Sequence, residues 1–218
     1  YGVAMGVLAR ERTGQRQHID IGMLDSVAAV LTYQAGIYFA TGQAPPRLGN
    51  QHPTIVPYET FSASDGDIVV AVGNDNLFIK FCGVIGTPAL AEDERFATNA
   101  GRIENQDALR PLLAERIGTR TRADWLSALK TTGIPCGSVR DLAEVLTDSQ
   151  LQERLMVLSV DHPKVGPMQV LGVPVKLASN PGGVRTPPPT LGQHTERILE
   201  ELGYDAAARG ALAEAKVI

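Results

Sequence analysis

Apolar residues recur at helical spacing in two stretches near the start of the chain. The first stretch ends at Gly14, a residue type that commonly closes helices. The second is rich in Ala and predicts a helix over 26–41, with Asp25 as its N-cap or first-turn acid. Between them, apolar and polar side chains alternate over 17–21, which predicts a short strand.

The middle of the chain changes from helical spacing to β-type alternation and back. Residues 58–72 predict a β-hairpin, because Asp65-Gly66 is a strong turn signal between two arms rich in β-formers. Helical patterns follow from Leu77 and over 106–117 and 122–131, separated by a polar stretch over 93–105. That stretch predicts a surface passage, with Phe96 embedded in it.

The last third of the chain predicts short elements of both kinds. Thr195 is the expected N-cap of a helix near the end. The expected elements are helices at 141–146, 149–154, 196–202 and 205–217, and strands at 157–160 and 168–170. Helices and hairpins interleave without strict β-α-β alternation, so the pattern predicts a mixed α and β fold. A central α+β region between helix-rich ends would suit a small domain inserted into a larger one.

The loop from Arg47 to Tyr58 has the most distinctive composition in the chain. It holds two prolines, a Gly-Asn pair and His52. Proline fixes φ, while Gly and Asn tolerate positive φ, so the residues of this loop restrict its shape. Backbone N–H groups beside an imidazole would suit a small anionic or carbonyl ligand. The structural alternative is a rigid connector.

Composition and charge exclude several function classes. The net charge of −4 predicts no nucleic-acid partner, and no apolar run has the length of a membrane span, so no membrane partner is expected. Cys82 and Cys136 have no metal-ligand or disulfide pattern, which fits a reduced, cytoplasmic compartment. The histidines are scattered and predict no metal site. From the residues alone, this is a soluble α+β protein with one shaped loop.

A series of motifs, in order along nearly the whole chain, resembles CoA-transferase family III. The matching segments are 10–14 (RERTG), 18–25 (HIDIGMLD), 49–58 (GNQHPTIVPY), 71–74 (AVGN), 96–99 (FATN), 133–137 (GIPCG) and 188–195 (PPTLGQHT). The resemblance implies an α/β fold, in which this chain forms the C-terminal part of a Rossmann-like large domain and a smaller α+β domain. It implies residues 1–50 as large-domain helices and linker, 51–165 as the small domain, and 166–218 as the return to the large domain.

The resemblance also implies a reaction and an assembly. The family moves CoA from an acyl-CoA donor to a carboxylic acid through an aspartyl anhydride and an aspartyl-CoA thioester, which is covalent catalysis by a carboxylate. The finer resemblance is to enzymes that act on dicarboxylic acids. CoA is then a substrate, no cofactor is bound permanently, and the expected partner is a second copy in an interlocked homodimer.

The nucleophile and most CoA contacts are expected upstream of this chain. Tyr1 begins in what resembles the middle of a helix, so we expect a missing N-terminal segment and an inactive isolated chain. Asp25 matches the helix-entry acid of the family pattern and is not the nucleophile. The residues that the resemblance places at the site are Met23, Gly49, Asn50, Gln51, His52, Pro53 and Thr54. The loop residues among them would cover the aspartate.

Two other functions stay open. An α-methylacyl-CoA racemase of the same superfamily would carry a Glu just after the strand that ends in Ala71-Val72-Gly73, where this chain has Asn74-Asp75-Asn76. A non-catalytic fragment that serves assembly is the other alternative.

Overall fold

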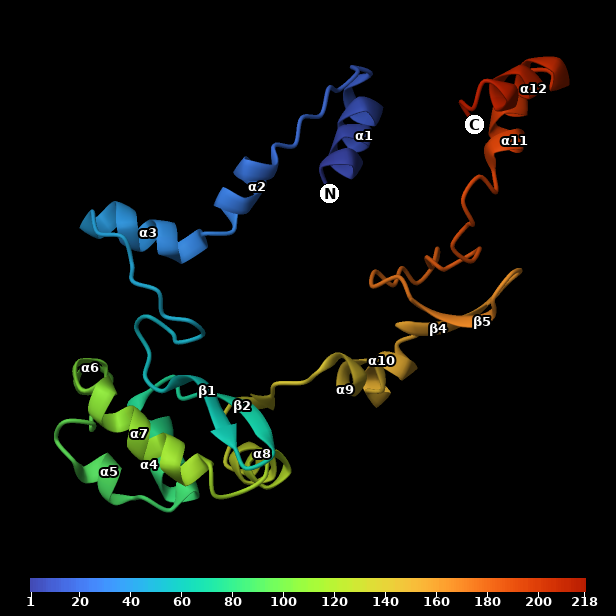
Figure 1. Ribbon diagram of the computed structural model, residues 1–218. Helices are drawn as coiled ribbons and strands as arrows, with labels where there is room; N and C mark the ends of the chain where they lie inside the picture. Colours follow the sequence, from blue (N-terminus) through green and yellow to red (C-terminus); the bar gives the residue numbers. More distant parts are fainter. The chain divides into compact units, whose positions relative to one another are not determined.

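The computed structural model describes residues 1–218, which form two units, Tyr1–Ser138 and Val139–Ile218 (Figure 1). The buried hydrophobic residues all lie in the first unit, between Val56 and Ile134. The predicted domains of the whole protein, with boundaries at 1–50, 51–165 and 166–218, do not correspond to these two units. That assignment stays a prediction.

The first unit begins with three helices that bury no residue: α1 (Gly2–Thr13), α2 (Met23–Ala29) and α3 (Thr32–Thr41). The single helix predicted over 26–41 is wrong, because the chain breaks between α2 and α3. The N–H groups of Val30 and Leu31 donate to the carbonyl oxygens of Val27 and Ala28, three residues earlier, whereas an α-helix bonds residues four apart. Thr32 then adopts a φ of 43°. A β-branched residue at positive φ cannot continue a right-handed helix.

The strand predicted over 17–21 is also wrong. No strand pairs with this segment, and an unpaired β-strand lacks the hydrogen bonds that define it. Its apolar residue Ile19 packs on α1 at Gly6, where an added Cβ would come within 2.6 Å of the Ile19 Cδ1 atom. The alternating apolar residues therefore cover a helix rather than one face of a sheet.

A three-stranded antiparallel sheet in the order β1-β2-β3 forms one side of the core. Its strands are β1 (Tyr58–Ala63), β2 (Gly66–Ala71) and β3 (Cys136–Ser138). The predicted hairpin is confirmed, with Phe61 opposite Ile68. Gly66, at a φ of 138°, opens the second strand, a backbone conformation that glycine adopts without strain.

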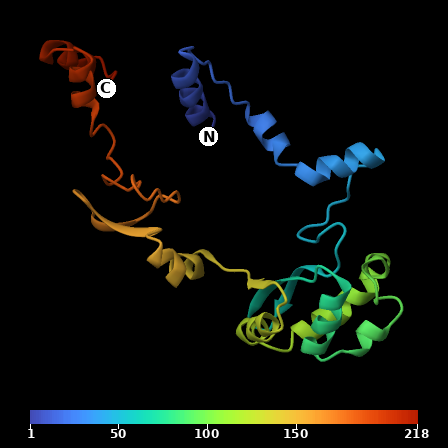
Figure 2. The same ribbon diagram turned by 180° about the vertical axis from the view of Figure 1, so that it is seen from behind.

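Five helices gather beside the β1–β2 hairpin in both views of the molecule (Figures 1 and 2). They are α4 (Asp75–Ile85), α5 (Ala89–Glu92), α6 (Asn99–Glu104), α7 (Gln106–Ile117) and α8 (Arg122–Thr131). The helices predicted over 106–117 and 122–131 are confirmed. Side chains at the preceding residues Asn74, Thr98 and Thr121 cap α4, α6 and α8 by accepting backbone N–H bonds.

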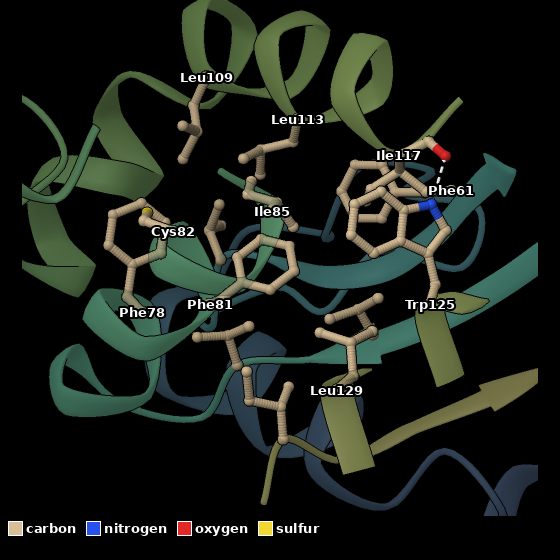
Figure 3. Close-up of a cluster of buried hydrophobic side chains, with 14 of the residues drawn as sticks. Phe61, Phe78, Phe81, Cys82, Ile85, Leu109, Leu113, Ile117, Trp125 and Leu129 are labelled. Atoms are coloured by element: carbon tan, nitrogen blue, oxygen red, sulfur yellow. Dashed lines mark hydrogen bonds between the residues drawn. The ribbon is translucent and has the colours of Figure 1, made fainter. Parts of the chain in front are cut away.

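The core lies between this sheet and helices α4, α7 and α8 (Figure 3). Trp125 is 1% exposed, and its indole Nε1–H donates to the Ile117 carbonyl oxygen at 2.6 Å. That bond satisfies the one polar atom of the ring. The largest apolar side chains around it are Phe61, Phe78, Phe81, Ile85, Leu109, Leu113 and Leu129.

The surface passage predicted over 93–105 is wrong in part. The segment contains α6, and both Phe96 and Arg102 are fully buried. A buried guanidinium is tolerated only when its donors find acceptors. The acceptors of Arg102 include groups from segments that are distant in the sequence. The local polar pattern of residues 93–105 therefore does not reveal that Arg102 is buried.

The second unit consists of short elements: α9 (Leu142–Leu146), α10 (Ser149–Glu153), the antiparallel pair β4 (Val157–His162) and β5 (Gly166–Leu171), α11 (Thr195–Glu201) and α12 (Ala206–Glu214). The predicted helices and the two predicted strands are confirmed. The N-cap of α11 is His194 and not Thr195, which is the first helical residue. His162 is buried, and its Nδ1 accepts N–H bonds from Lys164 and Val165 in the turn.

Replacing Leu113 with Ala is expected to lower the free energy of unfolding by about 2–5 kcal/mol, because it leaves a cavity in the core. Leu113 is 1% exposed, whereas its neighbour Leu112 is 40% exposed and supplies the matched control, Leu112→Ala. Denaturant unfolding followed by the fluorescence of Trp125, the sole tryptophan, measures both variants. Equal losses in the two variants would contradict the assigned core.

Burial raises the pKa of the Cys82 thiol to about 11 from 9.0, against the opposing effect of the Arg102 guanidinium. The unfolded chain therefore loses this proton first, so the folded state loses stability as pH rises from 9.0 toward about 11. The free energy of unfolding, measured across this range, is expected to fall more steeply for the wild type than for Cys82→Ala. Equal slopes in the two proteins would show that the thiol contributes nothing.

Candidate functional site

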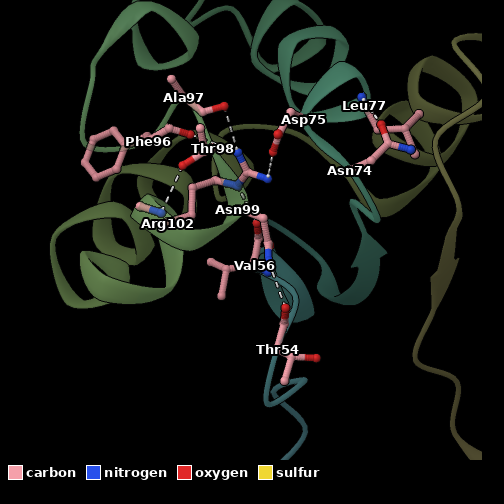
Figure 4. A network of polar contacts seen from close by, with 11 residues as sticks. Thr54, Val56, Asn74, Asp75, Leu77, Phe96, Ala97, Thr98, Asn99 and Arg102 are labelled. Atoms are coloured by element: carbon pink, nitrogen blue, oxygen red, sulfur yellow. Dashed lines mark hydrogen bonds and ion pairs between the residues drawn. The ribbon is translucent and has the colours of Figure 1, made fainter.

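The loop between α3 and β1 is fixed at its C-terminal end by two side chains of α6 (Figure 4). Asn99 Nδ2 donates to the Thr54 carbonyl oxygen at 2.8 Å, and its Oδ1 accepts the Val56 N–H at 3.1 Å. Arg102 Nε donates to the Val56 carbonyl oxygen at 2.6 Å. These three bonds satisfy successive backbone groups, so residues 54–56 are held against α6.

Arg102 binds three other groups besides the loop. Its Nη1 donates to the Phe96 and Ala97 carbonyl oxygens at 2.9 and 3.3 Å, and its Nη2 donates to Asp75 Oδ1 at 2.8 Å. The guanidinium carbon lies 4.3 Å from the centroid of the Phe78 ring. The charge is thus both paired and hydrogen-bonded, the condition under which burial of an arginine is tolerated.

The N-terminal side of the loop is joined to the first strand. Asn50 Nδ2 donates to Thr60 Oγ1 at 2.6 Å, and the Thr60 N–H donates back to Asn50 Oδ1 at 3.4 Å. His52 N–H donates to the Tyr58 carbonyl oxygen at 2.9 Å. The loop therefore folds back on β1 and presents its side chains at a fixed place.

The His52 ring stacks with two tyrosine rings. Its centroid is 5.2 Å from that of Tyr58 and 6.0 Å from that of Tyr33, with interplanar angles of 8° and 18°. Its Nδ1 accepts the Thr54 N–H at 3.2 Å. Two stacked neighbours and one hydrogen bond restrict both the tilt and the rotation of the imidazole.

A cavity of about 530 Å³ opens beside this ring. None of its lining side chains is an Asp, Glu, Lys or Arg: they belong to Tyr33, Gln34, Pro45, Pro46, Leu48, Gly49, Asn50, Gln51, His52 and Tyr58. The Oε1 atom of Gln34 is buried without a hydrogen-bond partner. The cavity therefore offers neutral donors and acceptors to a ligand.

The predicted site residues fall into two groups. Gly49, Asn50, Gln51 and His52 line the cavity, while Met23 lies on α2, is 82% exposed and is not part of its lining. Pro53 and Thr54 lie outside the lining, although the Thr54 amide contacts His52. The roles of all of these residues stay predictions.

Sequence reasoning missed Tyr33, Gln34, Asn99 and Arg102. Asn99 and Arg102 are three residues apart, a spacing that places two side chains on one face of a helix. That spacing within 93–105 is the signal that could have found them. The sequence held no comparable signal for Tyr33, because its contact with His52 joins an α3 residue to a loop far along the chain.

The structure shows neither a cluster of metal ligands nor a helix that could span a membrane. No group of three or more His, Cys, Asp or Glu side chains could hold a metal ion. None of the helices combines the length and apolar character needed to cross a bilayer.

Replacing Asn99 with Ala is expected to release the loop without disrupting the core, because it removes both bonds to Thr54 and Val56 at a cost of about 1 kcal/mol for each. Hydrogen exchange measured by mass spectrometry should show faster exchange at the Val56 amide, with unchanged exchange in α7. Asn76→Ala is the control, since Asn76 is exposed on α4. Unchanged exchange at Val56 in the Asn99 variant would contradict the anchoring role.

Comparison with known proteins places this fold and loop in one family. The chain matches the model of CoA-transferase family III over residues 1–195. It is 40% identical over 177 residues to the acetyl-CoA:oxalate CoA-transferase of Acetobacter aceti. The matched region covers 81% of this chain and 44% of that protein. It is 36% identical over 210 residues to the succinyl-CoA:glutarate CoA-transferase of Mus musculus, covering 95% of this chain and 48% of that protein.

A solved structure agrees with these matches. The crystal structure of a CAIB/BAIF family protein from Brucella suis superposes with a TM-score of 0.76 at 38% identity, covering 92% of this chain and 52% of that one. This chain therefore spans about half the length of the relatives that it matches. The predicted α/β class and family are confirmed: the chain belongs to CoA-transferase family III.

Proposed function

We propose that the protein containing this chain transfers CoA from an acyl-CoA donor to a dicarboxylic acid, and that loop residues 49–54 form one wall of the site. The names of the similar proteins support the substrate class, since they specify oxalate and glutarate as acceptors and acetyl-CoA and succinyl-CoA as donors. CoA is then a substrate, and no permanently bound cofactor is required.

The cavity without charged side chains is the observation that carries the proposal. Acyl transfer through an aspartyl anhydride and an aspartyl-CoA thioester develops transient negative charge on acyl oxygens. Neutral donors can stabilise that charge without binding the starting carboxylate so tightly that the barrier rises. The loop, held in place by Asn99 and Arg102, would also exclude water from the site and so protect the anhydride from hydrolysis.

The nucleophilic aspartate is expected upstream of this chain, which spans about half the length of its relatives. Asp25 does not fit that role: it lies in the first turn of α2, where a carboxylate favours the helix. The family resemblance further supports an interlocked homodimer and a place for Met23 near the nucleophile. The two free cysteines fit a cytoplasmic location. All of these stay proposals.

Asn74 and Asp75, which follow β2, do not favour the racemase alternative. Asn74 caps α4 by accepting the Leu77 N–H at 2.9 Å, and Asp75 pairs with Arg102 at 2.8 Å. A general base needs a carboxylate that is free to take a proton from the substrate. The residues at this position therefore have structural partners, and the names of the similar proteins given above are those of transferases.

The full-length protein, incubated with acetyl-CoA or succinyl-CoA and a panel of mono- and dicarboxylic acids, is expected to form new acyl-CoA thioesters most rapidly with dicarboxylic acids. Mass spectrometry of the products measures this, and the 218-residue chain alone should form none. Hydrolysis of the thioester without transfer, or racemisation of a branched acyl-CoA, would contradict the proposal.

Replacing His52 with Ala in the full-length enzyme is expected to lower kcat about 10²–10³-fold, the usual effect of losing one donor to a developing oxyanion. His194→Ala is the matched control, because His194 is exposed at the start of α11. Steady-state kinetics with the best donor and acceptor measure both variants. An unchanged kcat in His52→Ala would leave His52 with a structural role only.

A further inference from the structure

The two ring nitrogens of His52 are in different environments. Nδ1 accepts the backbone N–H of Thr54 at 3.2 Å, with the Thr54 hydroxyl at 3.4 Å. A backbone amide can only donate, so Nδ1 must be the unprotonated nitrogen of the ring. In a neutral imidazole the single proton then sits on Nε2.

Nε2 forms no hydrogen bond within the chain, and the His52 ring lines the cavity. The stacked rings of Tyr33 and Tyr58 prevent the imidazole from tilting away. Gln34, which lines the same cavity, buries its Oε1 atom without a partner.

We propose that the Thr54 amide fixes His52 as the Nε2–H tautomer, and that this Nε2–H donates to an acyl or carboxylate oxygen of the substrate. The proposal deepens the proposed function and rests on it for the identity of the ligand. His52 is the contacting residue, and Thr54 is a positioning residue that acts through its backbone N–H.

The chain supplies an internal reference for this tautomer. His162, the last residue of β4, accepts the N–H groups of Lys164 and Val165 on its Nδ1 at 3.1 and 3.3 Å. Its Nε2 must also carry the proton. His162 is buried in the second unit, so it shares the tautomer of His52 without sharing its cavity.

The first test measures the tautomer directly and needs no activity. In the 218-residue chain labelled with ¹⁵N in its four histidines, two-dimensional spectra at mildly alkaline pH distinguish an unprotonated Nδ1 from a protonated Nε2. His52, assigned by its loss in His52→Gln, is expected to show the same pattern as His162. An Nδ1–H pattern, or rapid exchange between tautomers at His52, would overturn the proposal.

The second test asks which ring nitrogen acts on the substrate. In the full-length enzyme, His52→Gln places an amide nitrogen near the position of Nε2, whereas His52→Asn places one near the position of Nδ1. The Gln variant is expected to keep kcat within about 10-fold of the wild type, while the Asn variant falls by about 10²-fold or more, as for loss of an oxyanion donor. Equal kcat values in the two variants, or a higher value for Asn, would overturn the assignment of Nε2.

The two tests separate this inference from the proposed function. If the wild-type enzyme transfers no CoA, the proposed function fails, and with it the ligand assigned to Nε2–H. The ¹⁵N pattern then still decides whether Thr54 fixes the tautomer. If transfer occurs and the spectra show Nδ1–H, the function stands and the inference fails.

Discussion

The buried guanidinium of Arg102 is the interaction on which the core of the first unit depends. Its nitrogens bind the Val56, Phe96 and Ala97 carbonyl oxygens and the Asp75 carboxylate. It thereby joins the end of the loop, the 93–98 segment and the start of α4. An unpaired buried charge would cost several kcal/mol, so burial of this guanidinium depends on these acceptors.

This network also sets the position of the site. Asn99 and Arg102 hold residues 54–56 against α6, and the bonds from Asn50 to Thr60 hold the other end of the loop to β1. The imidazole of His52 lies between these two anchors, stacked on Tyr58. The stability of the core and the geometry of the cavity are therefore linked through one helix face.

The sequence predicted best those elements whose evidence is local. The helices at 106–117 and 122–131 and the hairpin at 58–72 each carry their own periodicity or turn residues. The prediction failed where distant partners decide the structure: 17–21 has no pairing strand, and Arg102 is buried through acceptors from three segments. The helix over 26–41 failed for a local reason, the positive φ of Thr32, which its Ala-rich pattern concealed.

The candidate site was predictable to a similar extent. Loop composition drew attention to His52 and its neighbours, and the family resemblance extended this to Gly49, Asn50 and Gln51, all of which line the cavity. The stacking of Tyr33 and the unpaired Oε1 atom of Gln34 required the folded chain, because both belong to α3. The role of Met23 stays a prediction.

The most direct test of the central claim is a crystal structure of the full-length protein with a CoA thioester and a dicarboxylic acid bound. The account predicts a substrate oxygen about 2.7–3.2 Å from Nε2 of His52, the range of an ordinary hydrogen bond. It also predicts that residues 54–56 are still bound to Asn99 and Arg102. Substrates bound elsewhere, with the cavity beside His52 empty, would contradict the claim that this loop is a wall of the acyl-transfer site.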